Sequence, residues 1–162
     1  MTSIVYLSLG SNIDREHNIR AGIRALRKQF SKLELSPVYE SEAVGFEGDS
    51  FFNLIARIET KLSLSDLSAS LKNLENELGR DRTAQRFASR TMDIDIVLFD
   101  ELVGCYAEIE LPRPELFYNA FVLKPMADIR PHEIEPKTGK SFAELNEQLA
   151  TDQRLWQVPF SF

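Results

Sequence analysis

Two aspartates, Asp93 and Asp95, stand one residue apart in an otherwise apolar run over residues 92–99. Side chains alternate between the two faces of a strand, so both carboxylates are expected on one face, about 7 Å apart along the strand. Carboxylates held in this way repel each other unless a cation lies between them, and hard oxygen ligands suit Mg²⁺. The spacing therefore predicts a magnesium site.

An arginine-rich segment directly precedes this run, with four arginines in positions 80–90: Arg80, Arg82, Arg86 and Arg90. Guanidinium groups bind phosphate oxygens in a bidentate geometry. Carboxylates for a metal beside guanidiniums for phosphate are the groups that a metal–polyphosphate substrate requires. From these residues alone two other interpretations stay open, a solvated edge whose acids pair with arginines and an ordinary basic surface segment.

The other side of the acidic strand is expected to be apolar. Met92, Ile94, Ile96 and Leu98 would point together into a core. A strand anchored in this way holds its acidic face in place. Anchored acids that face clustered arginines are a candidate site.

The length of 162 residues fits a single soluble domain over residues 1–162, and 43% hydrophobic residues can build a sizeable core. The net charge of −6 argues against a general nucleic-acid or membrane-surface binder, so the local arginine cluster indicates a specific role. The single cysteine, Cys105, excludes an internal disulfide and fits a reducing compartment. The sequence shows neither a signal peptide nor a membrane span, and we expect a cytoplasmic monomer.

The apolar pattern predicts the element order βαββαβ. Strands are expected at 4–9, 33–40, 51–60 and 92–99, and Pro37 indicates an edge position or an interruption in the second of them. Apolar faces predict two helices, through Ile19, Ile23, Leu26 and Phe30, and through Leu64, Leu67, Leu71, Leu74 and Leu78. This order is typical of a ferredoxin-like α+β fold, an antiparallel sheet with helices on one face.

The segments that flank these elements carry further expectations. Gly10-Ser11-Asn12 is expected to form a turn with helix-capping side chains, and Ser63 or Ser65 can cap the second helix. The C-terminal extension should form short helices that pack back on the sheet, the last over residues 142–149. The tail aromatics, Trp156, Phe160 and Phe162, are expected to serve packing.

The topology also predicts which residues share a surface with the acid pair. If the helices cover the face that holds Leu54 and Ile94, the opposite face presents Phe51 and Asn53 together with the two aspartates. An aromatic ring, an amide and two acids on one open surface would suit a planar polar ring beside a metal. Asn53 is unfavourable in a strand interior, which favours a binding role.

Taken together, these segments resemble the 6-hydroxymethyl-7,8-dihydropterin pyrophosphokinase family, from Tyr6 to about Pro131. The matching motifs, in chain order, are Leu9-Gly10-Ser11-Asn12, Phe51-Phe52-Asn53, Glu75 with Gly79-Arg80-x-Arg82, Arg90-Thr91-Met92-Asp93-Ile94-Asp95-Ile96, Leu111-Pro112-x-Pro114 and Phe121-Val122-Leu123-x-Pro125. The Arg-Thr-x-Asp-x-Asp stretch is close to a family signature. Its occurrence in order with the others makes the resemblance specific.

The resemblance implies a ferredoxin-like fold and the transfer of pyrophosphate from MgATP to the hydroxymethyl group of the pterin, releasing AMP, in folate biosynthesis. It implies catalytic roles for Arg82, Arg90, Asp93 and Asp95, with two Mg²⁺ ions on the aspartates. The residues implied to bind ATP are Glu75, Arg80, Arg82, Arg90, Ile96 and Arg113. The residues implied to bind the pterin are Ser41, Val44, Phe51, Asn53 and Phe121.

Simpler interpretations exist for three of these positions. Phe121 could belong to the core, Glu75 could be a solvated helix residue, and Gly10 could serve only a turn. A ferredoxin-like interaction module without enzymatic activity would explain the fold, but it would not explain the order of the motifs. A polymerase-palm or cyclase-like metal site is an alternative by fold analogy that the flanking motifs do not suggest.

Several positions depart from the family pattern: Glu42, Phe87, Ser89, Glu108, Glu110, Arg113 and Asn119. Arg113 stands where the family commonly has a histidine, and Asn119 where it has a phosphate-contacting arginine. Loss of such an arginine weakens transition-state stabilisation, although Arg113 could partly replace its charge. The departures leave an alternative function open, a diverged pterin- or nucleotide-binding relative with weak or no transferase activity.

Overall fold

The computed structural model describes residues 2–41, 50–79, 92–151 and 153–161. Its elements are, in chain order, β1 (Ser3–Ser11), α1 (Arg15–Gln29), β2 (Leu33–Leu35), β3 (Val38–Ser41), β4 (Phe51–Thr60), α2 (Leu64–Gly79), β5 (Asp93–Phe99), β6 (Gly104–Tyr106), β7 (Ile109–Leu111), the short 3₁₀ helix η1 (Pro114–Phe117), α3 (Ala120–Ile129), α4 (Phe142–Gln148) and β8 (Leu155–Val158). The predicted βαββαβ order runs from β1 to β5, with β2 and β3 as the interrupted second strand. None of the helices in these ranges is both long and apolar enough to cross a bilayer.

The main sheet is antiparallel, with the strand order β5-β1-β4-β3-β8, and β2 pairs with β4 next to this path. The register places Gly10 of β1 between Asn53 of β4 and Asp93 of β5, and it places Ser8 opposite Asp95. The predicted α+β fold with an antiparallel sheet is confirmed. The predicted amide on β4 and the predicted acids on the edge strand β5 therefore lie on either side of β1.

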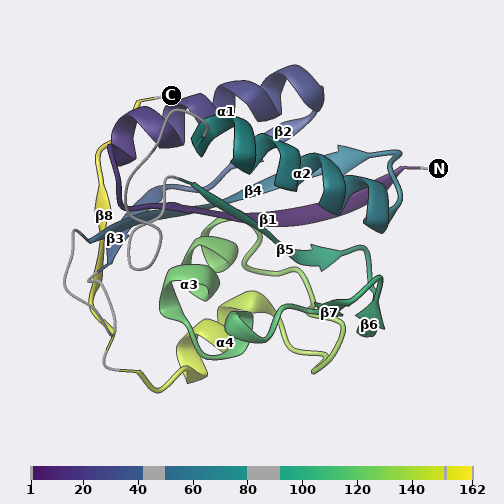
Figure 1. The fold of residues 1–162 in the computed structure, drawn as a ribbon. Coiled ribbons are helices and arrows are strands. Elements are labelled where there is room, and N and C mark those ends of the chain that lie inside the picture. The colour runs from purple at the N-terminus through teal and green to yellow at the C-terminus, as the bar shows by residue number, and fades with distance from the viewer. Residues whose placement is uncertain (1, 42–49, 80–91, 152, 162) are drawn as a thin grey trace.

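Helices lie on both faces of this sheet (Figure 1). The two helices of the βαββαβ unit, α1 and α2, cover one face over a core that includes Leu54, Ile94 and Leu71. The C-terminal extension, with α3 and α4, covers part of the other face over a second core that includes Ile55 and Met126. The expected open surface is therefore narrower than predicted, because the apolar residues of α3 bury part of that face.

A β-bulge in β5 changes the predicted sidedness of one residue. Met92, Ile94 and Ile96 lie in the first core as expected. The pairing with β1 shifts between Tyr6 and Leu7, which are opposite Leu98 and Ile96, so Val97 is the extra residue. An extra residue interrupts the alternation of a strand. Leu98 therefore lies in the second core, and its predicted place beside Ile96 is wrong.

The predicted start of α2 is present in the structure, and the predicted start of α1 is not. Ser63 Oγ accepts a hydrogen bond from the Asp66 N–H at 3.1 Å and caps α2, as predicted. The expected capping turn before α1 is wrong, because β1 continues to Ser11 and the N-cap is Asp14. Pairing of Gly10 and Ser11 with β4 extends the strand past the predicted turn.

The C-terminal tail forms an element that the sequence did not predict. Strand β8 pairs with β3 and becomes the edge of the sheet (Figure 1). Phe160 packs edge-on against Phe52, with ring centroids 6.1 Å apart, in agreement with the predicted packing role. Trp156 is 45% exposed and its indole N–H is hydrogen-bonded to Glu40, so its role is not core packing.

Candidate active site

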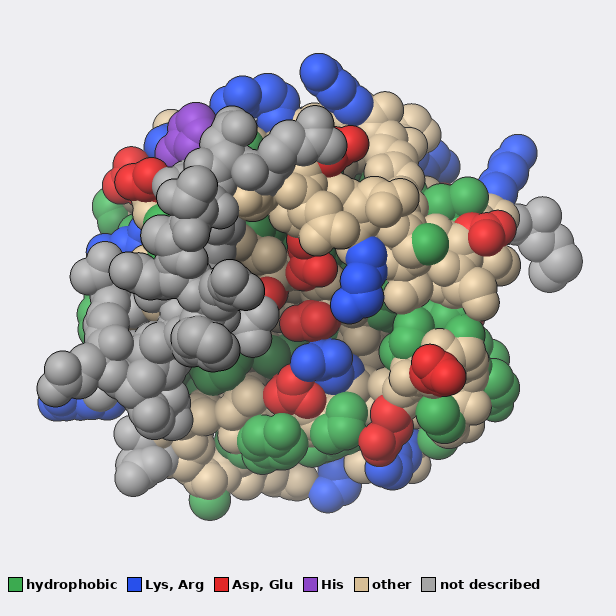
Figure 2. Space-filling view, in the orientation of Figure 1, with side chains coloured by type: hydrophobic (Ala, Val, Ile, Leu, Met, Phe, Trp, Pro, Cys, Tyr) green, Lys and Arg blue, Asp and Glu red, His purple; other side chains and the backbone are tan. Residues whose placement is uncertain are grey.

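A cavity of about 260 Å³ between the sheet and the C-terminal layer is lined by seven of the predicted site residues: Ser41, Phe51, Asn53, Asp93, Asp95, Arg113 and Phe121. The face that contains it carries acidic side chains at its middle with basic side chains beside them (Figure 2). We call this cavity of about 260 Å³ the first cavity. Its lining residues come from β1, β3, β4, β5, η1 and α3 and the turns next to them: Ser8, Gly10, Ser41, Phe51, Asn53, Asp93, Asp95, Arg113, Glu115, Asn119, Phe121 and Val122.

Asp93 and Asp95 both line this cavity and both are half-buried. Strand β5 positions them, because Ile94 between them is buried in the opposite core. The predicted placement of the two carboxylates on one face is therefore present in the structure. Two acids at one surface provide a hard oxygen donor set that fits Mg²⁺, provided that substrate oxygens and water complete the coordination.

Arg113 brings a positive charge next to this acid pair. Its guanidinium lies 3.7 Å from Asp95 and 2.7 Å from Glu115. Its backbone N–H donates to the carbonyl of Val97 at 2.9 Å, which ties the residue to the bulge in β5. The ion pairs are about one third exposed, so their contribution to stability is small and the side chain can turn toward an anionic ligand. Glu115 is a cavity residue that sequence reasoning missed, since it belongs to no motif.

Asn53 is a buried polar residue of the first cavity. It is only 5% exposed, and its side-chain Nδ2 donates to Ser41 Oγ at 3.0 Å. Gly10 lies opposite in β1, inside the strand, and not in the turn that was its simpler interpretation. A Cβ on Gly10 would stand 2.8 Å from Asn53 Oδ1, so glycine makes room for the amide.

Two aromatic rings reach the first cavity from different layers. Phe51 belongs to β4 in the sheet, and Phe121 belongs to α3 in the C-terminal layer. Both are half-buried, and Phe121 also packs against the second core. The two interpretations of Phe121 are thus compatible, because one part of its ring can pack while another faces the cavity.

A second cavity, of about 290 Å³, lies between α2, β5 and the β6–β7 hairpin. Its lining residues are Ser68, Leu71, Lys72, Glu75, Ile94, Asp95, Ile96, Ala107, Glu108, Ile109 and Arg113. Asp95 and Arg113 line both cavities. These two residues therefore mark the place where the two cavities adjoin.

Glu75 connects α2 to the acidic strand. Its carboxylate accepts a hydrogen bond from the Ile94 N–H at 2.7 Å, so it is not simply a solvated helix residue. Burial raises the pKa of Glu75 above its ordinary value, and the charges of Asp93 and Asp95 raise it further, although the Ile94 hydrogen bond opposes this. The three carboxylates create a negative potential, which a bound cation would offset.

Four predicted site residues lie outside the described residues: Val44, Arg80, Arg82 and Arg90. The same holds for the family departures Glu42, Phe87 and Ser89. The catalytic role of the two arginines at 82 and 90, and the ATP-binding role of Arg80, stay predictions.

The described residues that depart from the family pattern lie at different places in the structure. Glu108 lines the second cavity. Glu110 lies in β7 and is exposed. Asn119 lines the first cavity, but its Oδ1 accepts a hydrogen bond from Gln153 Nε2 at 2.8 Å. Gln153 is a second residue that sequence reasoning missed, because nothing in its local sequence indicates a partner so far along the chain.

Comparison with known proteins agrees with this arrangement. A sequence model of the family 7,8-dihydro-6-hydroxymethylpterin-pyrophosphokinase matches residues 6–131. A 2-amino-4-hydroxy-6-hydroxymethyldihydropteridine pyrophosphokinase from Bacillus subtilis is 36% identical over 133 residues, which cover 80% of this chain and 79% of that protein. The enzyme of the same name from Aquifex aeolicus is 34% identical over 142 residues, covering 86% and 88% of the two chains. The chain therefore belongs to the 7,8-dihydro-6-hydroxymethylpterin-pyrophosphokinase family.

Longer relatives contain the same domain. A folic acid synthesis protein from Dictyostelium discoideum is 38% identical over 136 residues, and the match covers 83% of this chain but only 20% of that protein. A crystal structure of wild-type Plasmodium falciparum HPPK-DHPS with pteroate superimposes with a TM-score of 0.69 at 14% identity, covering 91% of this chain and 42% of that chain. At this identity the structural match shows the fold alone, and it confirms the ferredoxin-like architecture.

Proposed function

We propose that this chain transfers a pyrophosphoryl group from ATP to the hydroxymethyl oxygen of 6-hydroxymethyl-7,8-dihydropterin, giving AMP, as its family membership implies. The observation that carries the proposal is the pair of adjoining cavities that share Asp95 and Arg113. A transfer reaction requires two substrates whose reacting atoms meet. The acceptor would occupy the first cavity, the adenosine would occupy the second, and the phosphates would cross the shared boundary.

The first cavity has the chemistry of a pterin site. Phe51 and Phe121 offer apolar ring faces, on which a flat bicycle can bury area by stacking. Asn53, held by Ser41, offers a fixed amide edge for the hydrogen-bonding groups of the ring. A buried and preorganised amide discriminates strongly against rings that cannot pair with it.

The nucleotide side is assigned to the second cavity. Glu75 and the backbone near Ile96 would hold the adenosine, and Arg113 would reach the phosphates from the boundary. A guanidinium offers two parallel donors to phosphate oxygens. The arginines at 80, 82 and 90 would add to this charge, as the resemblance to the pyrophosphokinase family implies.

Asp93 and Asp95 fit Mg²⁺, the metal that the family generally uses, and we infer that two ions bind with ATP. Bound there, magnesium would offset the negative charge on the phosphate oxygens around the attacked phosphorus. The protein's contribution is to hold both carboxylates on one face and to place Arg113 next to Asp95.

A product assay tests the proposal directly. Incubation with MgATP and hydroxymethyldihydropterin should form AMP and pterin pyrophosphate in equal amounts, and omission of either the pterin or magnesium should prevent AMP formation. Formation of ADP, or of AMP without pterin, would contradict the proposal. Chromatography on an anion-exchange column separates the nucleotides.

A second candidate function is a diverged pterin binder with little transferase activity. It is favoured by Asn119, which stands where the family has a phosphate-contacting arginine and is hydrogen-bonded to Gln153. Pterin binding detected by fluorescence, with no AMP above background, would support this candidate. The expectations of a monomer and of a cytoplasmic location stay predictions, and sedimentation equilibrium tests the first.

A further inference from the structure

The tail that follows the family match returns to the substrate site. The match ends at residue 131. Over the four positions 153–156 the tail contacts α3 on one side of the first cavity and β3 on the other. Neither Gln153 nor Trp156 is among the described residues that line either cavity. Any effect of these two side chains on substrates must therefore act through their neighbours.

Gln153 holds the beginning of α3. Its Oε1 accepts a hydrogen bond from the Ala120 N–H at 2.6 Å, and its Nε2 donates to Asn119 Oδ1 at 2.8 Å. The first N–H groups of a helix have no partner within the helix, and the N-cap residue Asn119 provides no side-chain cap of its own. Gln153 supplies the missing acceptor from the tail. Asn119 and Phe121, on either side of Ala120, both line the first cavity.

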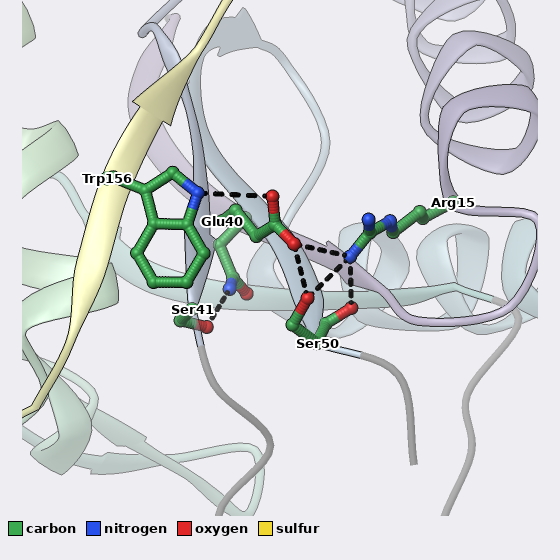
Figure 3. Close-up of polar contacts among 6 residues, drawn as sticks. Arg15, Glu40, Ser41, Ser50 and Trp156 are labelled. Carbon is green, nitrogen blue, oxygen red and sulfur yellow. Dashed lines mark hydrogen bonds and ion pairs between the residues drawn. The ribbon is translucent and has the colours of Figure 1, made fainter.

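Trp156 holds the opposite wall through Glu40. Its indole N–H donates to Glu40 Oε1 at 3.2 Å, across the β3–β8 pairing (Figure 3). The other oxygen of Glu40 accepts from Ser50 Oγ at 2.5 Å and from Arg15 Nη1 at 3.0 Å. Arg15 also donates to the Ser50 carbonyl at 2.8 Å. Trp156 thus joins a network that ties β8, β3, α1 and the start of β4 together.

The residues next to this network are cavity residues. Ser41 follows Glu40 in β3, and Phe51 follows Ser50 at the start of β4. Ser41 and Phe51 are paired in the register of the two strands. Both line the first cavity, and Ser41 holds the Asn53 amide. A shift of Glu40 would therefore move both the stacking ring and the amide partner.

We propose that Gln153 and Trp156 are positioning residues for the acceptor substrate, which set the distance between the α3 wall and the β3–β4 wall of the first cavity. The inference rests on the proposed function, because it assigns the pterin to this cavity. Neither residue contacts the elements α2 or β5 through a hydrogen bond given above, so the nucleotide side should be independent of both.

The variants Gln153→Ala and Trp156→Phe test this role. Gln157→Ala is the control, since Gln157 is exposed in β8 next to Trp156. Gln153→Ala should raise the KM and the Kd for the pterin about five- to twentyfold, the effect of one or two lost hydrogen bonds. Trp156→Phe should raise them about threefold, because its hydrogen bond is longer and exposed. The Kd for MgATP should change by less than about twofold in all three variants.

A conservative variant separates positioning from general stability. Gln153→Glu keeps an acceptor for the Ala120 N–H, and the Asn119 amide can rotate to donate to it, so most of the pterin affinity should return. If Gln153 served only the stability of the fold, Gln153→Ala would lower the Tm and weaken the binding of the pterin and of MgATP together. That result, or a Gln153→Ala variant equal to Gln157→Ala in pterin KM, would overturn the inference.

The two proposals fail in different ways. Wild-type protein that forms no AMP with pterin and MgATP would remove the proposed function. Wild-type protein that forms AMP, with the pterin Kd unchanged in Gln153→Ala or in Trp156→Phe, would remove the positioning role of that residue and leave the proposed function in place. If Gln153→Ala does not fold, Trp156→Phe still decides the question, because its pterin Kd should rise about threefold while its Kd for MgATP changes by less than about twofold.

Discussion

Gly10 and Asn53 face each other in β1 and β4 so closely that the space for a Cβ on Gly10 is taken by the Asn53 amide, 2.8 Å away. Both residues line the first cavity, and Gly10 pairs on its other side with Asp93 of the acid pair. The glycine thus contributes to the site without offering a functional group. Its contribution is the position that it allows the amide to take.

The substitution Gly10→Ala should displace the Asn53 side chain from its bond with Ser41. We expect the Kd for the pterin to rise about tenfold, the effect of one misplaced buried hydrogen bond, and the free energy of unfolding to fall by about 1–3 kcal/mol. Fluorescence titration and urea denaturation measure the two effects. Gly79→Ala is the matched control for stability, because a Cβ there meets no atom within 4 Å. Unchanged pterin affinity in Gly10→Ala would contradict this role of Asn53.

The substitution Asp95→Asn should abolish the transfer reaction while keeping the fold. The amide keeps the shape of the side chain but loses the charge that a magnesium ligand needs, so kcat should fall by at least about a thousandfold. Magnesium-dependent ATP affinity should fall as well, measured by calorimetry with and without the metal. Asp66→Asn, on the exposed side of α2, is the control. Retained MgATP affinity in Asp95→Asn would remove the metal assignment.

Glu75→Ala should weaken ATP binding at the second cavity without changing pterin binding at the first. It leaves the buried Ile94 N–H without its acceptor, which costs about 1–3 kcal/mol of stability. It also removes a wall of the second cavity, so the KM for ATP should rise while the Kd for the pterin stays unchanged. Glu75→Gln keeps an acceptor oxygen and should lose less stability. Glu77→Ala, exposed on the same helix, is the control. A Glu75→Ala variant that loses pterin affinity as strongly as ATP affinity would contradict the division into two sites.

The network around Glu40 predicts a pH dependence of stability. Hydrogen bonding from Ser50 lowers the pKa of Glu40 below its ordinary value of 4.5, and the Arg15 guanidinium lowers it further. A carboxyl group with a lowered folded-state pKa stabilises the fold fully above its unfolded pKa, and this stabilisation is lost as the pH falls through the folded value. Wild type should therefore exceed Glu40→Gln in stability by about 1 kcal/mol at neutral pH, and the difference should shrink below about pH 4.5.

Urea denaturation of both proteins between about pH 3 and pH 7 measures this difference. Glu101→Gln, which removes one exposed carboxylate from a turn, is the control. A stability difference between wild type and Glu40→Gln that does not vary over this range would show that Glu40 is not held as a charged group.

Local periodicity was sufficient for much of the fold and of the site. The alternation in β4 placed Leu54 and Asn53 on opposite faces, and both lie as predicted. The leucine spacing predicted α2 and its buried face, because an amphipathic face repeats along the chain without regard to its partner. The acid pair was predicted on one face for the same reason, since only one residue separates the two.

The failures occurred where a distant segment decides the geometry. The bulge at Val97 depends on the pairing of β5 with β1, so alternation within β5 could not indicate the position of Leu98. The tail was expected to provide packing aromatics, but pairing with β3 made it a strand and brought Trp156 to Glu40.

The sequence by itself therefore determined the order of the elements and the types of residue that face the site. Only the tertiary structure decided that Asp95 and Arg113 lie at the boundary between two cavities, and that Gln153 caps α3. The physical reason is the range of the contacts. Side-chain alternation is a property of neighbours in the chain, whereas the bond from Ala120 to Gln153 spans 33 residues and the bond from Trp156 to Glu40 spans 116.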